Sequence, residues 1–248
     1  GINNLWGHSE TKVFTKEKWQ AIQKKYKPPE LPLHIVYQSK EFLKLAAPTS
    51  LNKKWVTLHV LDNTKIDVAR GADINNYYPT IKYLIREGFH VFRIGDKSMP
   101  ICKKMQGLTD LAHIEHENFL DIYLIKHADF HIGVQSGPNY LAHLFNRDLL
   151  VTNLTEWSTA LPRKKGNFFI LKKIYDKPTR QRIPISYLLK KEFNFQINVN
   201  NIENRNIIIE ENSSIEVLES VKYFLDFRKN NISYSKKQIN FDKRKNDW

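Results

Sequence analysis

The sequence predicts an α/β fold built on a doubly wound, Rossmann-like parallel sheet. Two observations indicate it: short apolar strands alternate with helices between residues 55 and 153, and polar or small residues follow each strand. Short, continuously apolar strands of this kind are typical of a parallel sheet covered by helices on both faces. We therefore expect one sheet whose strands and helices follow each other along the chain.

The expected elements follow from apolar runs and from the residues that end them. Strands are expected at 55–60, 89–94, 130–134, 149–153 and 168–174, and helices at 77–87, 119–127, 138–145, 183–191 and 213–227. Asn76 and Asn118 are candidate N-caps, and Gly88 is expected to end the first of these helices. Ser213 and Glu216 have the spacing of a capping box. The last helix is expected to bury four apolar residues, Val217, Val221, Phe224 and Leu225.

Both ends of the chain lie outside this alternation. A helix is expected at 15–26, and the stretch between Pro32 and Pro48 is expected to be irregular. The last twenty residues carry six Lys or Arg against two Asp, with few apolar residues, so we expect a flexible tail. The predicted division is a linker at 1–50, a folded domain at 51–228 and a basic tail at 229–248.

The composition favours certain partners and a certain cellular compartment. The net charge is +13, from 39 basic and 26 acidic residues, which favours anionic partners such as nucleotide phosphates or an acidic membrane surface. An AT-rich genome, which increases Lys and Asn, explains the charge outside the site equally well. Cys102 is the single cysteine, so no internal disulfide forms and a reducing, cytoplasmic location is expected. Nucleic acid is disfavoured, because no basic-aromatic sheet face or recognition helix is visible.

The most informative stretch follows the strand at 130–134. Gln135, Ser136 and Gly137 form a small-residue turn, and Pro138 stands where a first helical residue belongs. Such a turn directs backbone N–H groups and the positive end of a helix dipole at one point outside the sheet, which suits a phosphate. The alternative is a helix cap with no ligand.

Polar residues also follow the other strands. In open parallel sheets, ligands bind outside the carboxyl ends of the strands. The residues at those ends are His59 and Asp62, then Arg93, Gly95 and Asp96, and finally Asn153. Arg93 can hold a diphosphate through its planar guanidinium group, or it can pair with a carboxylate such as Asp96. His59 can be a catalyst or a hydrogen-bonded structural residue, and Asp73 can contact a substrate hydroxyl or cap a turn.

Several chemistries lack their motifs. The chain has no Gly-x-Gly-x-x-Gly after a strand, no Walker lysine loop and no Gly-x-Ser-x-Gly elbow, which disfavours dinucleotide oxidoreductases, P-loop ATPases and α/β-hydrolases. An Asp-x-Asp element for a metal-bound nucleotide sugar is also absent. The segment 113–117 is rich in His and Glu but lacks zincin spacing, so we expect no metal site.

Four segments together resemble known glycosyltransferases. The stretch from Val134 to Ala142 resembles the donor-site turn of heptosyltransferase-like enzymes, which have two facing Rossmann-like domains, the GT-B fold. The segments 72–77, 91–96 and 121–123 look like a family of bacterial glycosyltransferases associated with surface polysaccharides. The resemblance covers about residues 55–226. It departs at Leu61, where related sequences commonly have arginine, which puts a diphosphate contact from that strand end in doubt.

The resemblance implies a C-terminal, donor-binding half of a GT-B enzyme. A nucleotide-diphosphate sugar would bind without a cofactor or an essential metal, held by Arg93 and the Ser136-Gly137 turn, and a glycan or lipid-linked molecule would accept the sugar. Residues 1–50 would be the remnant of an N-terminal acceptor domain. The candidate catalytic bases are His59, Asp62 and Asp73. The location would be cytoplasmic, with the inner membrane face as a further candidate surface. The alternative function is a noncatalytic module that binds a nucleotide sugar or a glycan.

Overall fold

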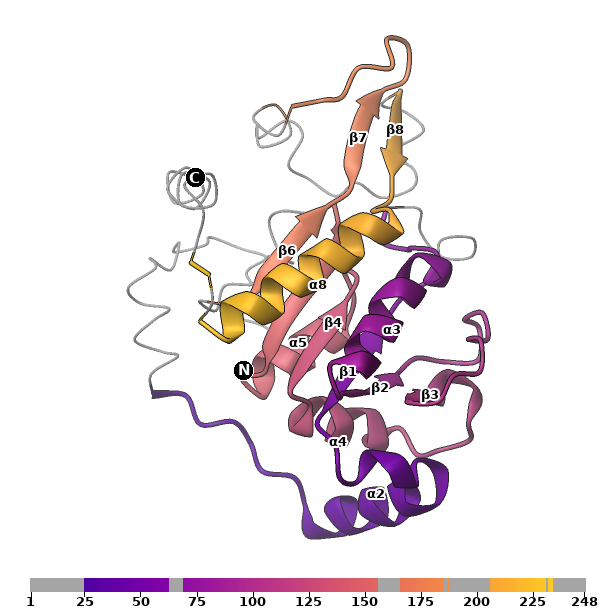
Figure 1. Cartoon of the computed structure of the whole chain (residues 1–248), viewed down its shortest axis with the longest axis vertical. Coiled ribbons are helices and arrows are strands. Elements are labelled where there is room, and N and C mark those ends of the chain that lie inside the picture. The colour runs from indigo at the N-terminus through magenta and orange to yellow at the C-terminus, as the bar shows by residue number, and fades with distance from the viewer. Residues whose placement is uncertain are drawn as a thin grey trace, which may run out of the picture.

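The computed structural model describes residues 25–62, 69–155, 166–184, 187, 206–230 and 232–233. Within them lies a six-stranded parallel sheet ordered β3-β2-β1-β4-β5-β6, and a separate antiparallel pair, β7-β8 (Figure 1). The strands are β1 Trp55–His59, β2 His90–Arg93, β3 Leu108–Asp110, β4 Phe130–Gly133, β5 Asp148–Leu154, β6 Phe168–Leu171, β7 Lys173–Asp176 and β8 Ile207–Glu210.

The strand order confirms the predicted fold class. The chain begins in the middle of the sheet at β1 and winds outward to β3, then returns beside β1 at β4 and winds outward on the other side. This is the order of the Rossmann fold, in which a crevice opens where the winding direction changes. The change of direction, or switch point, lies here between β1 and β4.

Helices cover both faces of the sheet, as predicted. The helices are α2 Leu33–Ala46, α3 Tyr78–Arg86, α4 Phe119–His127, α5 Pro138–Leu144 and α8 Ser214–Arg228. The helices α3 and α8 lie side by side on one face and share its apolar core, whereas α2, α4 and α5 contribute to the core of the other face (Figure 1). Side chains of β5 alternate between the two cores: Leu150 packs in the first, and Leu149 and Val151 pack in the second.

The α8 helix begins as the sequence predicted. Ser213 accepts a hydrogen bond from the Glu216 backbone N–H at 3.3 Å, and the Glu216 carboxylate accepts one from the Ser213 N–H at 2.9 Å. This is the predicted capping box. The four residues expected to be buried on this helix are buried.

Other boundaries differ from the prediction. The stretch between Pro32 and Pro48 is not irregular: it contains α2, whose Leu43 belongs to the second core. Because Leu43 shares this core with residues after position 50, the predicted boundary at residue 50 does not separate two cores. The first βα connection is capped by Asp73 rather than Asn76, because a 3₁₀ turn at Ile74–Tyr77 precedes α3. The helix α4 begins after Asn118 as predicted, but the Asn118 side chain makes no capping bond.

The predicted strand at 168–174 is two strands, and two further strands were missed. The break falls at Lys172, between β6 and β7, and β7 pairs with β8 in a ribbon that projects beyond the sheet (Figure 1). β3 has only three residues and gave no apolar run to detect. Most of the predicted helices at 15–26 and 183–191, and most of the tail at 229–248, lie outside the described residues.

Candidate functional site

The candidate site lies at the carboxyl ends of β1 and β4, on either side of the switch point. His59 is the last residue of β1 and stands opposite Gly133, the last residue of β4. A larger residue at Gly133 would force its neighbours to move, because a Cβ at this position would overlap the Asn139 Oδ1 atom. The close approach of Asn139 also fixes the start of α5, since its amide donates a 2.7 Å hydrogen bond to the Val134 carbonyl.

His59 and Ser136 contact each other across the switch point. The His59 Nδ1 atom lies 2.8 Å from the Ser136 Oγ atom, and the same hydroxyl donates to the Val134 carbonyl at 3.1 Å. With the hydroxyl proton directed at Val134, His59 donates from Nδ1, which leaves Nε2 unprotonated. Burial, and then the positive charge of Arg93, lower the pKa of His59 to about 4. The imidazole is therefore neutral near pH 7.

The turn after β4 leaves space next to its backbone. Gly137 has helical dihedral angles, φ −51° and ψ −45°, and a Cβ on it would meet nothing within 4 Å. Its conformation does not require glycine, and the position is exposed. Pro138 is the first residue of α5, as predicted. Pro138 has no N–H, and the Asn139 and Tyr140 N–H groups already donate to the Ser136 and Gly137 carbonyls. The turn therefore combines the Ser136 hydroxyl and the N–H groups of Ser136 and Gly137 with open space beside the Gly137 Cα.

Arg93 lies at the end of the neighbouring strand and is fully buried. Its Nη1 atom donates to Asp110 Oδ1 and to the Pro100 carbonyl, both at 2.9 Å. The carboxylate partner is therefore Asp110, on the strand missed from the sequence, and not Asp96. The Nε and Nη2 atoms have no hydrogen-bond partner among the described residues. A phosphate contact of Arg93 stays a prediction.

Gly95 and Asp96 shape the loop that leaves β2. Gly95 has φ +150°, a conformation that side chains rarely adopt, and a Cβ there would overlap the Met99 Sδ atom. Asp96 accepts a 2.8 Å bond from the Ser98 N–H, and the hydrogen bonds from Ser98 hold the pKa of this carboxyl below its ordinary value. Asp96 is therefore an ionised turn residue near His59 and Arg93.

The two acidic candidates differ in what they already do. Asp73 accepts hydrogen bonds from the backbone and side-chain amides of Asn75, each at 2.8 Å, which confirms the interpretation as a cap. Its own N–H donates to Glu211 Oε2 at 2.7 Å. Asp62 is buried shortly after β1. Catalytic roles for both stay predictions.

Gln135 lies in a row of polar residues along the carboxyl ends of β4, β5 and β6. The Thr155 hydroxyl lies 3.4 Å from Gln135 Oε1 and donates to the Ala69 carbonyl at 3.1 Å. The Lys172 Nζ atom donates to the Gly71 carbonyl at 2.5 Å, although this side chain is only 4% exposed. Lys172 was not predicted from the sequence as a buried cation at this edge. Its signal was a lysine inside an apolar run.

Asn153 has an internal role. It is fully buried, has φ +54°, and lies where the β5–β6 register shifts. Its Nδ2 atom donates to the Tyr77 hydroxyl at 2.9 Å, and its Oδ1 atom accepts the Asn212 N–H at 2.7 Å. The Asn153 N–H in turn donates to Asn212 Oδ1 at 2.7 Å. Because both side-chain polar groups are engaged, we remove Asn153 from the predicted ligand contacts.

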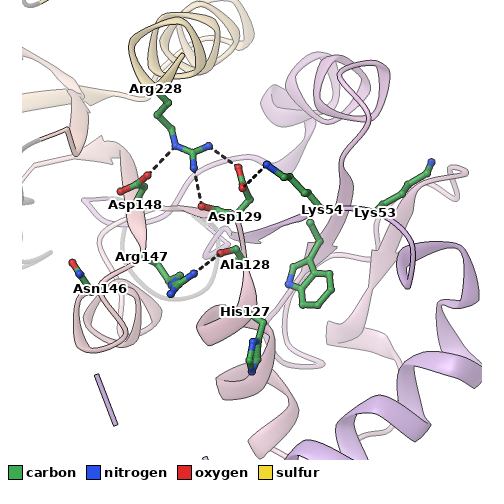
Figure 2. Close-up of a pocket in the computed structure, with 10 residues that line it drawn as sticks. Lys53, Lys54, His127, Ala128, Asp129, Asn146, Arg147, Asp148 and Arg228 are labelled. Carbon is green, nitrogen blue, oxygen red and sulfur yellow. Dashed lines mark hydrogen bonds and ion pairs between the residues drawn. The ribbon is translucent and has the colours of Figure 1, made fainter. Parts of the chain in front are cut away.

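A cavity of about 510 Å³ lies at the opposite, amino-terminal edge of the sheet (Figure 2). Arg228 reaches from the end of α8 to Asp129 Oδ2 at 2.6 Å and to Asp148 Oδ2 at 2.9 Å. Arg147 donates to the carbonyls of Phe145 and Ala128, at the carboxyl ends of α5 and α4. These charges therefore tie helices to strand ends, and we assign no ligand to the cavity.

Two properties of the described residues bear on metals and membranes. They contain no group of three or more His, Cys, Asp or Glu arranged to hold a metal ion. In the segment 113–117, His113 and His116 instead contact the backbone carbonyls of Met99 and Ile114. Among the helices described, none has the length and apolarity needed to cross a bilayer.

Comparisons with known proteins give a distant likeness of fold. No protein-family model and no curated protein matches the sequence. The structure is similar to that of E. coli ADP-heptose LPS heptosyltransferase II, with 13% identity, a TM-score of 0.48, and coverage of 82% of this chain and 54% of that chain. This chain thus spans about half the length of that enzyme.

Two structures of Thermosulfurimonas dismutans KpsC are also similar. The beta Kdo 2,4 transferase has 11% identity, a TM-score of 0.33, and coverage of 77% of this chain and 63% of that chain. The beta Kdo 2,7 transferase has 11% identity, a TM-score of 0.30, and coverage of 82% and 66%. At these identities no property of those enzymes is transferred to this chain.

Proposed function

We propose that this chain is the donor-binding part of a glycosyltransferase. A nucleoside-diphosphate sugar would lie across the switch point, with its diphosphate at the Ser136-Gly137 turn, and no metal or cofactor would be required. The observation that carries the proposal is the contact of His59 with Ser136 at the switch point, next to the open space over Gly137. Doubly wound sheets bind nucleotides at this place.

The chemistry of the site suits a departing nucleoside diphosphate. Glycosyl transfer places negative charge on that leaving group, and fixed hydrogen-bond donors and cations stabilise it. The N–H groups of Ser136 and Gly137 would supply donors, and Arg93 would supply the positive charge. The Ser136 hydroxyl would become a further donor by turning its proton from the Val134 carbonyl to the ligand. The turn also belongs to the segment that resembles the donor-site turn of heptosyltransferase-like enzymes. The specific choice of a sugar nucleotide rests on this resemblance.

His59 is the leading candidate for the base that receives the acceptor hydroxyl proton. Its imidazole is neutral near pH 7, and the hydrogen bond at Nδ1 leaves Nε2 able to accept a proton. Asp62 is the second candidate, and Asp73 the third because it already caps a turn. The acceptor would be a glycan or a lipid-linked molecule. The net charge of +13 would favour contact with an anionic membrane surface on the cytoplasmic side.

A thermal-shift screen tests the binding step. UDP-, GDP-, CMP- and dTDP-linked sugars would be added to the wild-type protein and to Ser136→Ala, and the nucleotide that fits should raise the melting temperature by mass action. Ser220→Ala is the matched control, since it removes a hydroxyl from α8 that bonds only to the Val217 carbonyl among the described residues. Unchanged melting temperatures with every nucleotide would contradict the proposal.

A noncatalytic binding module is the second candidate. Two observations favour it: a pKa of about 4 makes His59 a weak base, and Asp73 is engaged as a cap. Mass spectrometry of the reaction with the nucleotide sugar that binds distinguishes the two. Release of the nucleoside diphosphate, lost in His59→Gln with binding retained, supports transfer. Binding without release, in the presence of acceptor glycans, supports the module.

A further inference from the structure

The loop that follows β2 contacts the fully buried Arg93, whose Nη1 atom donates to the Pro100 carbonyl at 2.9 Å. The loop comprises residues 95–102 and is called the cover loop here. Most of its residues are exposed, and Ile101 is 73% exposed. Only Met99 and Cys102 are buried within it. A short segment with two buried anchors has few contacts to lose, so it can open without unfolding the sheet.

The two anchors of the cover loop are specific. Met99 packs on Gly95, and its backbone carbonyl accepts a 2.8 Å hydrogen bond from His113 Nε2. The Cys102 N–H donates to Asp110 Oδ2 at 2.8 Å, while Asp110 Oδ1 accepts from Arg93. One carboxylate therefore holds both the covered arginine and the end of the loop that covers it. Gly95, with φ +150°, is the point at which the backbone departs from the strand.

The closed loop leaves Arg93 poorly satisfied. The guanidinium is fully buried, yet its Nε and Nη2 atoms have no hydrogen-bond partner within the described part of the chain. A buried charged donor without a partner is costly, because it has lost its water and gained nothing in exchange. Such a group marks a place where another acceptor is expected to bind. Arg93 also lies within electrostatic range of His59, the residue at the switch point.

We propose that the cover loop is a lid that must open for the unpaired Arg93 N–H groups to receive a phosphate of the ligand. The identity of the ligand as a diphosphate rests on the proposed function; the opening of the loop does not. Opening would release Met99 from Gly95 and Cys102 from Asp110, and two adjacent N–H groups of Arg93 would then face an anion in fork geometry. Closed and open states are in equilibrium, and a ligand that binds only the open state shifts it.

The chain carries its own reporter of this opening. Cys102 is its single cysteine, and in the closed loop burial raises the pKa of the thiol to about 11. Only the thiolate reacts with a disulfide reagent such as DTNB. Opening both exposes the sulfur and returns its pKa towards the ordinary value, so the labelling rate measures the open population.

The test compares DTNB labelling rates at pH 8, with and without millimolar pyrophosphate. Met99→Ala should accelerate labelling at least tenfold, and Ile101→Ala, which alters an exposed side chain of the same loop, should not. Val221→Ala is the control for general destabilisation, because it removes buried atoms from α8 and leaves the loop intact. Pyrophosphate should accelerate labelling of the wild type, and Met99→Ala should bind it several-fold more tightly in calorimetry.

The outcomes separate the lid from the function. Equal labelling of Met99→Ala and Val221→Ala, at a rate that follows global unfolding in urea, would overturn the lid. Pyrophosphate that binds without changing the labelling rate would also overturn the lid and leave the proposed function standing. Fast labelling of Met99→Ala, with no pyrophosphate binding to any variant, would support the loop opening and count against the proposed function.

Discussion

The imidazole of His59 and the hydroxyl of Ser136 lie 2.8 Å apart although 77 residues separate them in the chain. The contact joins the end of β1 to the turn after β4, the two strands between which the winding direction of the sheet changes. A ligand that enters the crevice at this point therefore meets groups from both halves of the sheet at once.

Ser136→Ala should weaken binding of the nucleoside diphosphate about tenfold, which corresponds to about 1.4 kcal/mol, the scale of one hydrogen bond to a charged group. Since Ser136 is only partly buried, the free energy of unfolding should change by less than about 1 kcal/mol. Calorimetric titration measures the affinity, with Ser220→Ala as the control. Equal affinities of the two variants would remove the hydroxyl from the site.

Arg93 should be tested together with Asp110, because the two form a buried ion pair at 2.9 Å. Arg93→Met alone leaves the carboxylate without its partner and should destabilise the protein by about 3–5 kcal/mol. The double variant Arg93→Met/Asp110→Asn should recover part of this loss in urea denaturation.

The recovered double variant separates folding from binding. It should fold, and it should no longer bind pyrophosphate or a nucleoside diphosphate, because the positive charge is gone. A double variant that binds as tightly as the wild type would show that Arg93 has a structural role alone.

Asn212 should be more important for stability than its polar character indicates. The Asn212→Ala substitution leaves the buried Asn153 N–H without its acceptor and also removes the bond from Asn212 Nδ2 to the Leu171 carbonyl. Each orphaned buried group costs about 1–3 kcal/mol, so a loss of about 3 kcal/mol is expected in urea denaturation. Asn75→Ala, at an exposed position, is the control. A loss below about 1 kcal/mol would contradict the assignment of Asn153 to an internal role.

The fold was largely predictable because its signals are local. Apolar runs, the Pro138 helix start and the spacing of Ser213 and Glu216 each depend on residues within a few positions of one another. The failures have the same origin. β3 is too short to carry a periodic signal, and α2 lies between prolines that also occur beside irregular segments.

The site was predictable in its position and less so in its contacts. The carboxyl ends of the strands can be located from sequence, so the proximity of His59 to the Ser136 turn followed once β1 and β4 proved to be neighbours. Asp110, a partner of Arg93, comes from β3, and Asn212, a partner of Asn153, lies two residues before α8. Contacts between residues so far apart in the chain produce no regular spacing that could be recognised in the sequence.

Arg228 should contribute to stability through both of its carboxylates. Arg228→Met removes the guanidinium group, which lies over the Phe130 and Phe224 rings and pairs with Asp129 and Asp148 at the amino ends of β4 and β5. Asp129 keeps Lys54 at 3.6 Å. Because this pair is only partly buried, we expect a loss of about 2 kcal/mol in urea denaturation. The control is Lys222→Met on the same helix, which breaks an exposed pair with Glu219 and should cost less than about 0.5 kcal/mol. Equal losses of unfolding free energy in Arg228→Met and Lys222→Met would contradict a structural role for the Arg228 ion pairs.

Three buried histidines should make the protein acid-sensitive well above the range in which most carboxyl groups titrate. Burial is the first cause that lowers the pKa of each, to about 4 for His59 and His90 and to about 3 for His131. In the unfolded chain each pKa is about 6.5, so between pH 6.5 and 5 the unfolded state binds protons that the folded state does not. The free energy of unfolding must therefore fall as the pH falls through this window.

Each such proton contributes a slope of about 1.4 kcal/mol per pH unit once it is fully bound in the unfolded chain. Urea denaturation at pH 7.5, 6.5, 5.75 and 5 measures the slope. His90→Gln keeps a hydrogen-bonding group near the Thr109 hydroxyl, which lies 2.8 Å from His90 Nε2. It should reduce the slope by the contribution of one proton, about 1.4 kcal/mol per pH unit. His34→Gln, on the exposed face of α2, is the control substitution. A stability that is flat across this window would show that the folded protein takes up these protons as the unfolded chain does, and would contradict the lowered pKa values of the three imidazoles.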